Sequence, residues 1–469
     1  MPSTRAAFHE TATLIPVSAH LERVLAAVRA DARAIAAERI ETVRLADAAG
    51  RVLAASVDAV VASPPFDNSA MDGFAVRWAD VATATPDAPL TLTVVADHAA
   101  GSASALDAEP LGAGEAARIM TGAPVPAGAD TVVPVERTDG GDSPDARNDD
   151  DAGADTGADA AHLVRVFSAP DLGRHIRRAG EDLKVGDRVL EAGTLLGPRQ
   201  VAAAATAGHG TLDVVRRPRV TAIATGSELT DPGEALLPGR IPDSNSLLLA
   251  GLVRDAGCEL VEVVRMPDDE GLLRAWLDGL GPRDAVVFTG GVSVGAYDVV
   301  RRVLAELGTV DFVRVAMQPG SPQAFGRLAG GTPVFGLPGN PVAVAVSFEM
   351  FVRPALLALQ GRTDVQRRRL RATAAVGWDS PAGRLQVMPV SFVEGELDGD
   401  GDGDGGAPGA PGPPGTPGAL LSPAVRPATS GGAGSHLSGG LAAASGFAVV
   451  PEHVVRVEPG DVVEVLVIP

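Results

Sequence analysis

The stretch FTGGVSVGAYD, Phe288–Asp298, decides the fold prediction because it joins a predicted buried strand to a predicted helix. An apolar run at 285–288 begins the pattern, and residues 299–304 continue it with helical spacing. Glycine lacks a Cβ and permits positive φ, so backbone N–H groups in such a loop can approach an anion closely. Asp298, where the helix begins, is suited to hold a cation against that anion. The stretch predicts a phosphate-bearing ligand with Mg²⁺, although a plain tight turn uses similar residues.

The composition predicts a soluble protein of several domains. A length of 469 residues favours roughly three or four domains. Aromatic residues make up only 3% of the chain, so its cores must consist of Ala, Val and Leu. The net charge of −20 argues against nucleic acid or an anionic membrane as partner. We find no apolar run of membrane-spanning length and no signal-peptide core, and Cys258 is the single cysteine, so we expect a cytoplasmic protein.

The region after Pro218 has the alternation of strands and helices that is typical of βαβ units on a mostly parallel sheet. The predicted strands are 220–224, 260–265, 285–288, 310–316 and 333–336. The predicted helices between and after them are 247–255, 271–280, 299–307 and 342–359. The fold class is therefore multidomain α/β.

The rest of the chain has a different pattern. A helix is predicted over 18–37 and another over 195–207, with a β-rich segment over about 66–167. Residues 139–160 are rich in Asp, Gly and Ala, which predicts a disordered acidic insertion. Short strands return after residue 361, interrupted by the Gly/Pro/Asp segment 397–418, which predicts a flexible insertion.

Three further loops follow predicted strands or begin predicted helices. In Thr225–Leu229 (TGSEL), Glu228 could share a cation with Asp298 or bind a ligand hydroxyl; the alternative is a capping loop with a solvated carboxylate. Asp243, Ser244 and Asn245 could line the same pocket or serve only as helix caps. The stretch Gly336–Pro341 (GLPGNP) fits ligand contact or a simple turn before a helix.

Two polar clusters lie outside this region, and other chemistries lack support. Phe66–Val76 (FDNSAMDGFAV) and Arg177–Asp182 (RRAGED), taken alone, are typical of surface turns with local hydrogen bonds. The eight histidines form no pair at metal-ligand spacing, which argues against zinc. No serine has a recognisable histidine partner arrangement, which argues against a hydrolytic triad.

Taken together, these segments resemble the MoeA family, the molybdopterin molybdenumtransferases related to the gephyrin E domain. The ordered matches are FDNSAMDGFAV at 66–76, IMTGAP at 119–124, IRRAGED at 176–182, TGSEL at 225–229, DSN at 243–245, TGGVSVG at 289–295 and LPGNP at 337–341. Each match is weak alone, but the ordered set is highly specific and spans most of the chain.

The resemblance implies four structural parts. Residues 17–62 with 177–217 would form an elongated helical and strand region, and 63–176 a β-rich lobe inserted into it. Residues 218–360 would form the molybdopterin-binding α/β domain and 361–469 a C-terminal β-barrel-like domain. Family members are homodimers, and their active site lies between the α/β domain of one chain and the β-rich lobe of the other.

The resemblance also implies the reaction and the residues that perform it. Adenylylated molybdopterin and molybdate would react, with Mg²⁺, to give molybdenum cofactor and AMP. Asp298 and Glu228 would act in catalysis and bind the metal ion, and Asp67, Thr121 and Asp182 would come from the partner subunit. The substrate-binding residues would be Thr225, Gly226, Ser227, Asp243, Ser244, Asn245, Thr289, Gly290, Gly291, Ser293, Gly295, Pro338, Gly339, Asn340 and Pro341. The adenylyltransferase and molybdoenzyme apoproteins are further expected partners.

The chain departs from the family pattern where molybdate is expected to bind. Gln318 and Ser321 stand where the family usually has two lysines, so a cationic contact to an oxyanion is replaced by neutral donors. Arg384 and Ser435 do match the family pattern, and all four residues are our molybdate candidates. Two other functions therefore stay open: a paralogue that cleaves the adenylylated pterin but handles molybdate weakly, and a non-catalytic molybdopterin-binding scaffold. The sequence does not distinguish molybdate from tungstate.

Overall fold

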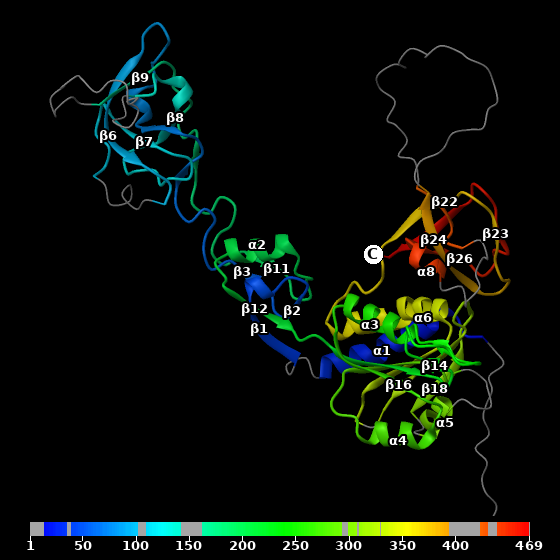
Figure 1. Cartoon of the computed structure of the whole chain (residues 1–469). Helices are drawn as coiled ribbons and strands as arrows, with labels where there is room; N and C mark the ends of the chain where they lie inside the picture. The colour runs from blue at the N-terminus through cyan, green and yellow to red at the C-terminus, as the bar shows by residue number, and fades with distance from the viewer. Residues whose placement is uncertain are drawn as a thin grey trace, which may run out of the picture. The chain divides into compact units, whose positions relative to one another are not determined.

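The computed structural model describes residues 14–34, 39–101, 109–141, 162–292, 299–306, 309–328, 330–393, 423–429 and 439–468. The predicted insertion 397–418 lies outside these residues, as does 139–160 apart from its first three positions. The chain divides into two compact units (Figure 1). The first comprises Met1–Glu41, Gly50–Ala54 and Asp213–Pro469, and the second comprises Thr42–Ala49 and Ala55–Leu212.

The first unit is built on a mixed sheet, and this confirms the predicted α/β class. The strand order among the described residues is β16 (Glu259–Met266), β13 (Arg219–Thr225), β17 (Ala285–Thr289), β21 (Pro333–Leu337), β20 (Pro322–Arg327) and β18 (Val310–Arg314). The first four are parallel, and β20 runs antiparallel to both of its neighbours, β21 and β18. Our sequence analysis missed β20, because its sequence PQAFGR begins with proline and has no continuous apolar run.

Helices cover both faces of this sheet (Figure 1). Alternate strand residues point to opposite faces, so Ala222 and Val287 join one core cluster and Ile223 and Phe288 join the other. The first cluster packs against α1 (Val17–Ala34), α3 (Asn245–Asp255), α6 (Pro341–Ser347) and α7 (Arg353–Leu359). The second packs against α4 (Glu270–Asp278) and α5 (Val299–Glu306).

The helix after the LPGNP loop corrects our expectation that the chain has no apolar run of membrane-spanning length. It runs without a break through α6, the π-helical turn η6 (Phe348–Val352) and α7. Among the described residues, this stretch of 19 residues is the one helix long and apolar enough to cross a membrane, with a mean hydropathy of 1.8. It is 94% buried within the protein, so it is a core helix of the α/β unit.

The C-terminal strands form a closed barrel, as the resemblance implied. Its described strands follow the order β24 (Leu385–Val393), β25 (Ala424–Pro427), β22 (Arg369–Ala374), β28 (Val462–Val467) and β26 (Gly446–Val450). The barrel closes because β24 pairs with β26 as well as with β25. Small and β-branched side chains fill the interior together with Trp378 and Met388.

The second unit contains the β-rich lobe. Its sheet has the order β8 (Thr131–Pro134), β5 (Gly73–Val76), β7 (Glu115–Ile119), β6 (Leu90–His98) and β9 (Leu163–Val166) within the described ranges. Shorter pairs join β4 (Asn68–Ser69) to β10 (Ile176–Arg177) and β3 (Val57–Asp58) to β11 (Arg188–Leu190). The helix α2 (Pro198–Thr206) follows, somewhat shorter than the predicted 195–207.

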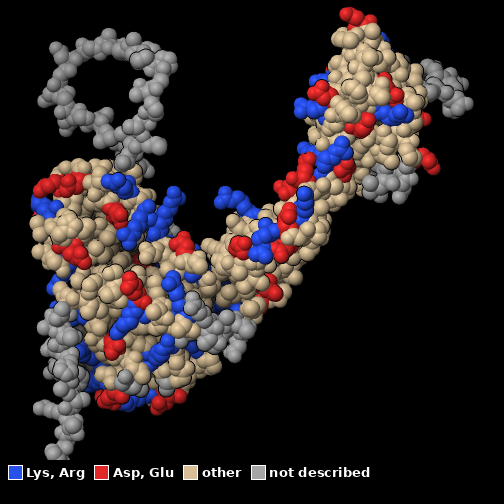
Figure 2. Space-filling view, turned by 180° about the vertical axis from the view of Figure 1, so that it is seen from behind, with Lys and Arg blue, Asp and Glu red and all other residues tan. Residues whose placement is uncertain are grey.

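Small elements complete the described structure, and the surface has mixed charge. They are β1 (Ile40–Arg44), η2 (Leu45–Asp47), β2 (Val52–Leu53), η3 (Trp78–Asp80), η4 (Val135–Arg137), β12 (Thr211–Val215), β14 (Leu229–Thr230), β15 (Ile241–Pro242), β19 (Met317–Gln318), β23 (Trp378–Asp379), α8 (Gly439–Ala443) and β27 (Arg456–Val457). On the face drawn in Figure 2, basic and acidic side chains are interspersed.

Candidate functional site

Three loops meet at the carboxyl edge of the parallel strands. Ala224 of β13 lies opposite Thr289 of β17, and Thr289 lies opposite Leu337 of β21. The residues that follow these strands are therefore neighbours, as parallel pairing requires. The Thr225 hydroxyl donates to the backbone oxygen of Thr289 over 3.2 Å, and the Gly290 N–H donates to the backbone oxygen of Leu337 over 3.1 Å.

Asn245, at the start of α3, ties two of these loops together. Its Nδ2 donates to the backbone oxygen of Gly339 over 2.6 Å and to Thr289 Oγ1 over 3.3 Å. The Thr289 hydroxyl in turn donates to the backbone oxygen of Pro338 over 3.1 Å. The Asn245 Oδ1 atom is buried and has no hydrogen-bond partner among the described residues. A buried acceptor without a partner is costly, so this atom is available to a donor on a ligand.

The glycine loop approaches its neighbours too closely for side chains. Gly290 has φ +87°, and a Cβ there would lie 2.5 Å from the backbone oxygen of Thr225. Gly291 has φ +65°, and its Cβ would lie 2.7 Å from Val300 Cγ2. Both positions therefore require glycine, as the sequence predicted for a close backbone approach. Ser293, Gly295 and Asp298 lie outside the described residues.

Glu228 has a carboxylate that is free to bind a ligand. A Cβ on Gly226 would lie 2.6 Å from one Glu228 carboxylate oxygen and 2.7 Å from the other, so the side chain folds back over that glycine. Glu228 is exposed, and no described residue donates a hydrogen bond or forms an ion pair with its carboxylate. The free oxygens fit the preference of a hard divalent cation for carboxylate ligands.

Two other predicted residues are occupied by structural interactions. The Asp243 carboxylate is buried and accepts from the Ser246 N–H over 3.0 Å and the Ser246 hydroxyl over 2.5 Å, so it caps α3. Ser227 forms a reciprocal pair with Asp268: its N–H donates to the carboxylate over 3.0 Å, and its hydroxyl accepts from the Asp268 N–H over 3.0 Å. Ser244 is exposed and makes no side-chain cap. Asn340 is the N-cap of α6, and Pro341 is its first residue.

The described molybdate candidates lie where the α/β domain meets the barrel. Strand β19 pairs with the start of β24, which places Gln318 opposite Gln386 and close to Arg384. Arg384 makes no hydrogen bond or ion pair among the described residues, so its guanidinium is free to bind an anion. The buried Ser321 hydroxyl donates to the backbone oxygen of Val315 over 2.9 Å, which leaves it no proton for an oxyanion. Ser435 lies outside the described residues.

The second unit holds a separate polar cluster, positioned by the pairing of β4 with β10. Asp67 accepts from the Ala179 N–H over 2.8 Å and from Arg178 Nη1 over 2.6 Å. The backbone hydrogen bond from Ala179, followed by the interaction with Arg178, lowers the pKa of the Asp67 carboxyl. Asp182 is exposed beside this turn, and its N–H donates to the backbone oxygen of Ser63 over 3.0 Å.

Asp72 belongs to the same unit, and our sequence analysis did not single it out. Its Oδ1 accepts from the Thr121 N–H over 2.6 Å and from the Thr121 hydroxyl over 2.7 Å. These two hydrogen bonds lower the pKa of the Asp72 carboxyl. Asp72 lies in the same FDNSAMDG segment as Asp67, so the sequence contained the signal, but only the fold shows that Asp72 holds Thr121.

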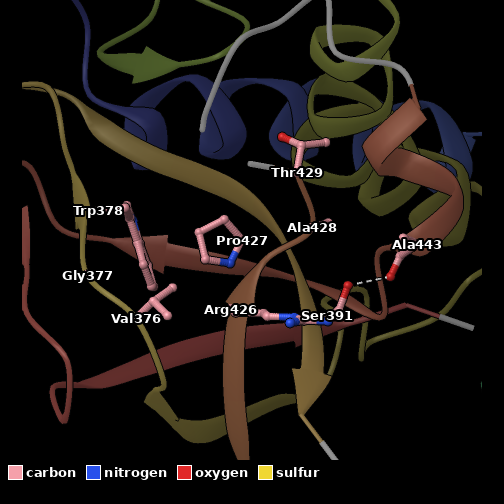
Figure 3. A pocket seen from close by; sticks show the side chains of 9 residues that line it. All are labelled: Val376, Gly377, Trp378, Ser391, Arg426, Pro427, Ala428, Thr429 and Ala443. Carbon is pink, nitrogen blue, oxygen red and sulfur yellow. Dashed lines mark hydrogen bonds between the residues drawn. The ribbon is translucent and has the colours of Figure 1, made fainter. Parts of the chain in front are cut away.

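The barrel has a cavity of about 500 Å³ that contains none of the predicted site residues. It lies among β23, β24, β25 and α8, and Trp378, Ser391 and Arg426 are among its lining residues (Figure 3). The Ser391 hydroxyl donates to the backbone oxygen of Ala443 over 2.6 Å. This cavity is therefore distinct from the loop edge described above.

The fold and the loop edge define a class of protein: a multidomain α/β protein with a ligand-binding edge on its central sheet and a C-terminal β-barrel. Family models match most of the chain. They are the MoeA N-terminal region (domain I and II) at residues 15–208, a probable molybdopterin binding domain at 221–358 and the MoeA C-terminal region (domain IV) at 423–468.

Individual relatives agree with this classification. Molybdopterin molybdenumtransferase 2 of Mycobacterium tuberculosis H37Rv is 44% identical over 352 residues, which cover 74% of this chain and 81% of the relative. Molybdopterin molybdenumtransferase of Bacillus subtilis is 37% identical, covering 67% of this chain and 70% of the relative. The crystal structure of the MoeA protein from Pyrococcus horikoshii OT3 is 26% identical with a TM-score of 0.71, covering 97% of this chain and 100% of that one.

The chain belongs to the MoeA family of molybdopterin molybdenumtransferases. It is thus a transferase of molybdenum cofactor biosynthesis.

Proposed function

We propose that this enzyme inserts molybdate into adenylylated molybdopterin and releases AMP, giving molybdenum cofactor. The observation that supports the substrate is the loop edge of the central sheet. Gly290 and Gly291 allow the backbone to approach a phosphoanhydride, and the unpartnered Asn245 Oδ1 is an acceptor for an N–H donor such as a pterin has.

The residues at this edge bind and orient the substrate. Asn245, Thr289 and Gly339 hold two loops in fixed register, so the ligand meets a preformed surface. Thr225, Gly226 and the loop containing Ser293 and Gly295 complete the nucleotide and pterin contacts in this proposal. The Ser227 and Asp243 side chains act indirectly, by fixing the loops to Asp268 and to α3.

We propose Mg²⁺ as the metal ion, held by Glu228 together with Asp298. The free carboxylate of Glu228 fits this ion in kind, because Mg²⁺ takes oxygen ligands and is commonly bound by one or two carboxylates with phosphate oxygens. When bound, the ion neutralises charge that develops on the phosphoanhydride. In this proposal, Glu228 and the glycine loop place the phosphoanhydride of the substrate at the end of β13, next to the loops that Asn245 ties together.

The polar cluster of the second unit supports a shared active site in a homodimer. Asp67, Thr121 and Asp182 would contribute from the partner subunit, together with Asp72, which holds the Thr121 hydroxyl and N–H in place. A mixing experiment tests this arrangement. Glu228→Gln and Asp67→Asn proteins, each inactive alone, should regain about a quarter of wild-type activity when mixed and re-paired, because mixed C2 dimers contain one intact site. No recovery from verified mixed dimers would contradict a shared site.

Molybdate would approach Arg384, with Gln318 beside it, and Ser435 is the further candidate in our proposal. Arg384 is a free cation, whereas Gln318 contributes only an amide donor. The loss of the two lysines is the observation that favours the alternative of a paralogue with weak molybdate handling. We also propose a cytoplasmic location, with the adenylyltransferase and molybdoenzyme apoproteins as partners.

One assay separates the functional alternatives. Purified protein is supplied with adenylylated molybdopterin, Mg²⁺ and molybdate, and both AMP release and reconstitution of a molybdenum-free apoenzyme are measured. Release with reconstitution supports the proposal, and release without reconstitution supports the paralogue. Neither product, from folded protein that binds the pterin, would support the scaffold and refute the enzymatic proposal.

A further inference from the structure

Arg353 is a buried cation with unsatisfied donors, far from the loop edge. It is the first residue of α7, twelve positions after Pro341, so it lies roughly 18 Å further along the helix. Its side chain is 11% exposed, and its Nε and Nη1 atoms are buried without a hydrogen-bond partner in the part of the chain that the structure describes. Buried guanidinium N–H groups without an acceptor are costly, so native structures normally supply one.

The nearest carboxylate is already in use. Glu349 is 3% exposed, and Arg367 binds it bidentately, with Nε–Oε2 and Nη2–Oε1 distances of 2.8 and 3.0 Å. The Arg353 Nε atom lies 3.9 Å from Glu349 Oε2, which is too long for a hydrogen bond. Glu349 therefore satisfies Arg367 and leaves Arg353 without an acceptor.

The surroundings have an excess of positive charge. Arg353 interacts electrostatically with the guanidinium groups of Arg367 and Arg362 and with the carboxylates of Glu349 and Asp364, so three cations face two anions. Burial first, and then repulsion by Arg367, lowers the pKa of Arg353. The Arg362 guanidinium makes no hydrogen bond or ion pair within the described part of the chain.

We propose that Arg353, Arg362 and Arg367 form a binding site for a small oxyanion of the phosphate or sulfate class, beside the junction of α7 and the segment 360–368. Such an anion supplies acceptors to the unsatisfied N–H groups and balances the extra positive charge. A guanidinium matches the paired oxygens of an oxyanion, which favours an oxyanion over chloride. The proposal is independent of the molybdenum chemistry.

Two features favour a small ion over other partners. Buried water could accept the N–H groups, but it would not balance the charge. An exposure of 11% leaves little room for a protein surface to reach Arg353, which favours an ion of four or five atoms. The π-helical turn Phe348–Val352 comes directly before Arg353, and such turns are frequent at functional sites.

Thermal unfolding and calorimetric titration with inorganic phosphate and with sulfate test the proposal. Chloride keeps the ionic strength constant. The wild-type midpoint should rise with phosphate or sulfate in a saturable way, because the ligand binds the folded state. Arg353→Met and Arg362→Met should weaken binding about tenfold or more, since each removes a charge-assisted contact. The control Arg371→Met removes an exposed positive charge on β22, outside the proposed cluster, and should bind like wild type.

The outcomes are distinct. An equal rise in all four proteins would show a general salt effect and overturn the proposal, as would a saturable rise in none. If Arg353→Met does not fold, Arg362→Met and Arg353→Lys decide the result, because the lysine keeps the charge but loses the planar fork. A molybdate titration separates this site from the proposed molybdate site, since binding that survives Arg353→Met but not Arg384→Met belongs to the site at Arg384.

Discussion

His20 makes the stability of the α/β unit depend on pH in a way that can be calculated. Its side chain is 2% exposed on α1, and its ring meets that of Phe351 edge to face at a centroid distance of 4.7 Å. Its Nδ1 atom has no hydrogen-bond partner within the described ranges. Burial, followed by repulsion from Arg23, lowers the pKa of His20 from 6.5 to about 4.

The sign of the effect follows from this depressed pKa. The unfolded chain binds the proton more readily, so the stabilisation is complete above pH 6.5 and is lost as the pH falls toward 4. The full loss corresponds to ~3 kcal/mol, and at pH 5.5 it is between about 1 and 2 kcal/mol. We choose pH 5.5 because the sequence pI is about 4.8, where low net charge favours precipitation.

Urea unfolding of wild type and His20→Phe, at pH 8 and pH 5.5, measures the effect. Wild type should lose between about 1 and 2 kcal/mol more than the variant between these pH values, because only wild type has the buried imidazole. His453→Phe, at an exposed position, serves as the control and should follow wild type. Equal losses in wild type and His20→Phe would refute the reasoning.

Three further predictions concern the proposed site. Gly290→Ala should lower the free energy of unfolding by ~2–4 kcal/mol, because its Cβ would lie 2.5 Å from a backbone oxygen at φ +87°. Urea unfolding measures this loss. The control is Gly50→Ala, where a Cβ meets no atom within 4 Å, and its free energy of unfolding should fall by less. Gln318→Lys should lower the KM for molybdate severalfold in the AMP-release assay by restoring a cation, and an unchanged KM would remove position 318 from the anion site. Asp72→Asn should reduce kcat about tenfold or more, since it weakens the hydrogen bonds that position Thr121. The thermal midpoint should not change, because Asp72 is exposed. Full activity would exclude the Asp72–Thr121 pair from catalysis.

The sequence predicted the loop edge well because parallel strands place their carboxyl ends together. The apolar runs of β13, β17 and β21 were recognisable, and their register follows from the pairing rule, so the proximity of Thr225 and Thr289 was a geometric consequence. The positive φ of Gly290 was likewise expected from its residue type and place.

Other features depend on tertiary contacts that residue types do not reveal. The sequence nominated Ser321 for anion binding, but the fold turns its hydroxyl to the backbone of Val315. Asp72 and Thr121 are far apart in sequence. Only the folded β-rich lobe brings them together, so their hydrogen bonds could not be predicted from the residue types. Strand β20 lacks a continuous apolar run, and only its pairing in the sheet buries Ala324 and Phe325 in the two core clusters.

The central claim is that this chain couples AMP release to molybdenum insertion. A single-turnover reaction with adenylylated molybdopterin, Mg²⁺ and molybdate measures AMP by chromatography and protein-bound molybdenum by elemental analysis. The account predicts equal amounts of AMP and inserted molybdenum in wild type, and loss of both in Glu228→Gln. AMP release without molybdenum insertion, or full activity of Glu228→Gln, would contradict it.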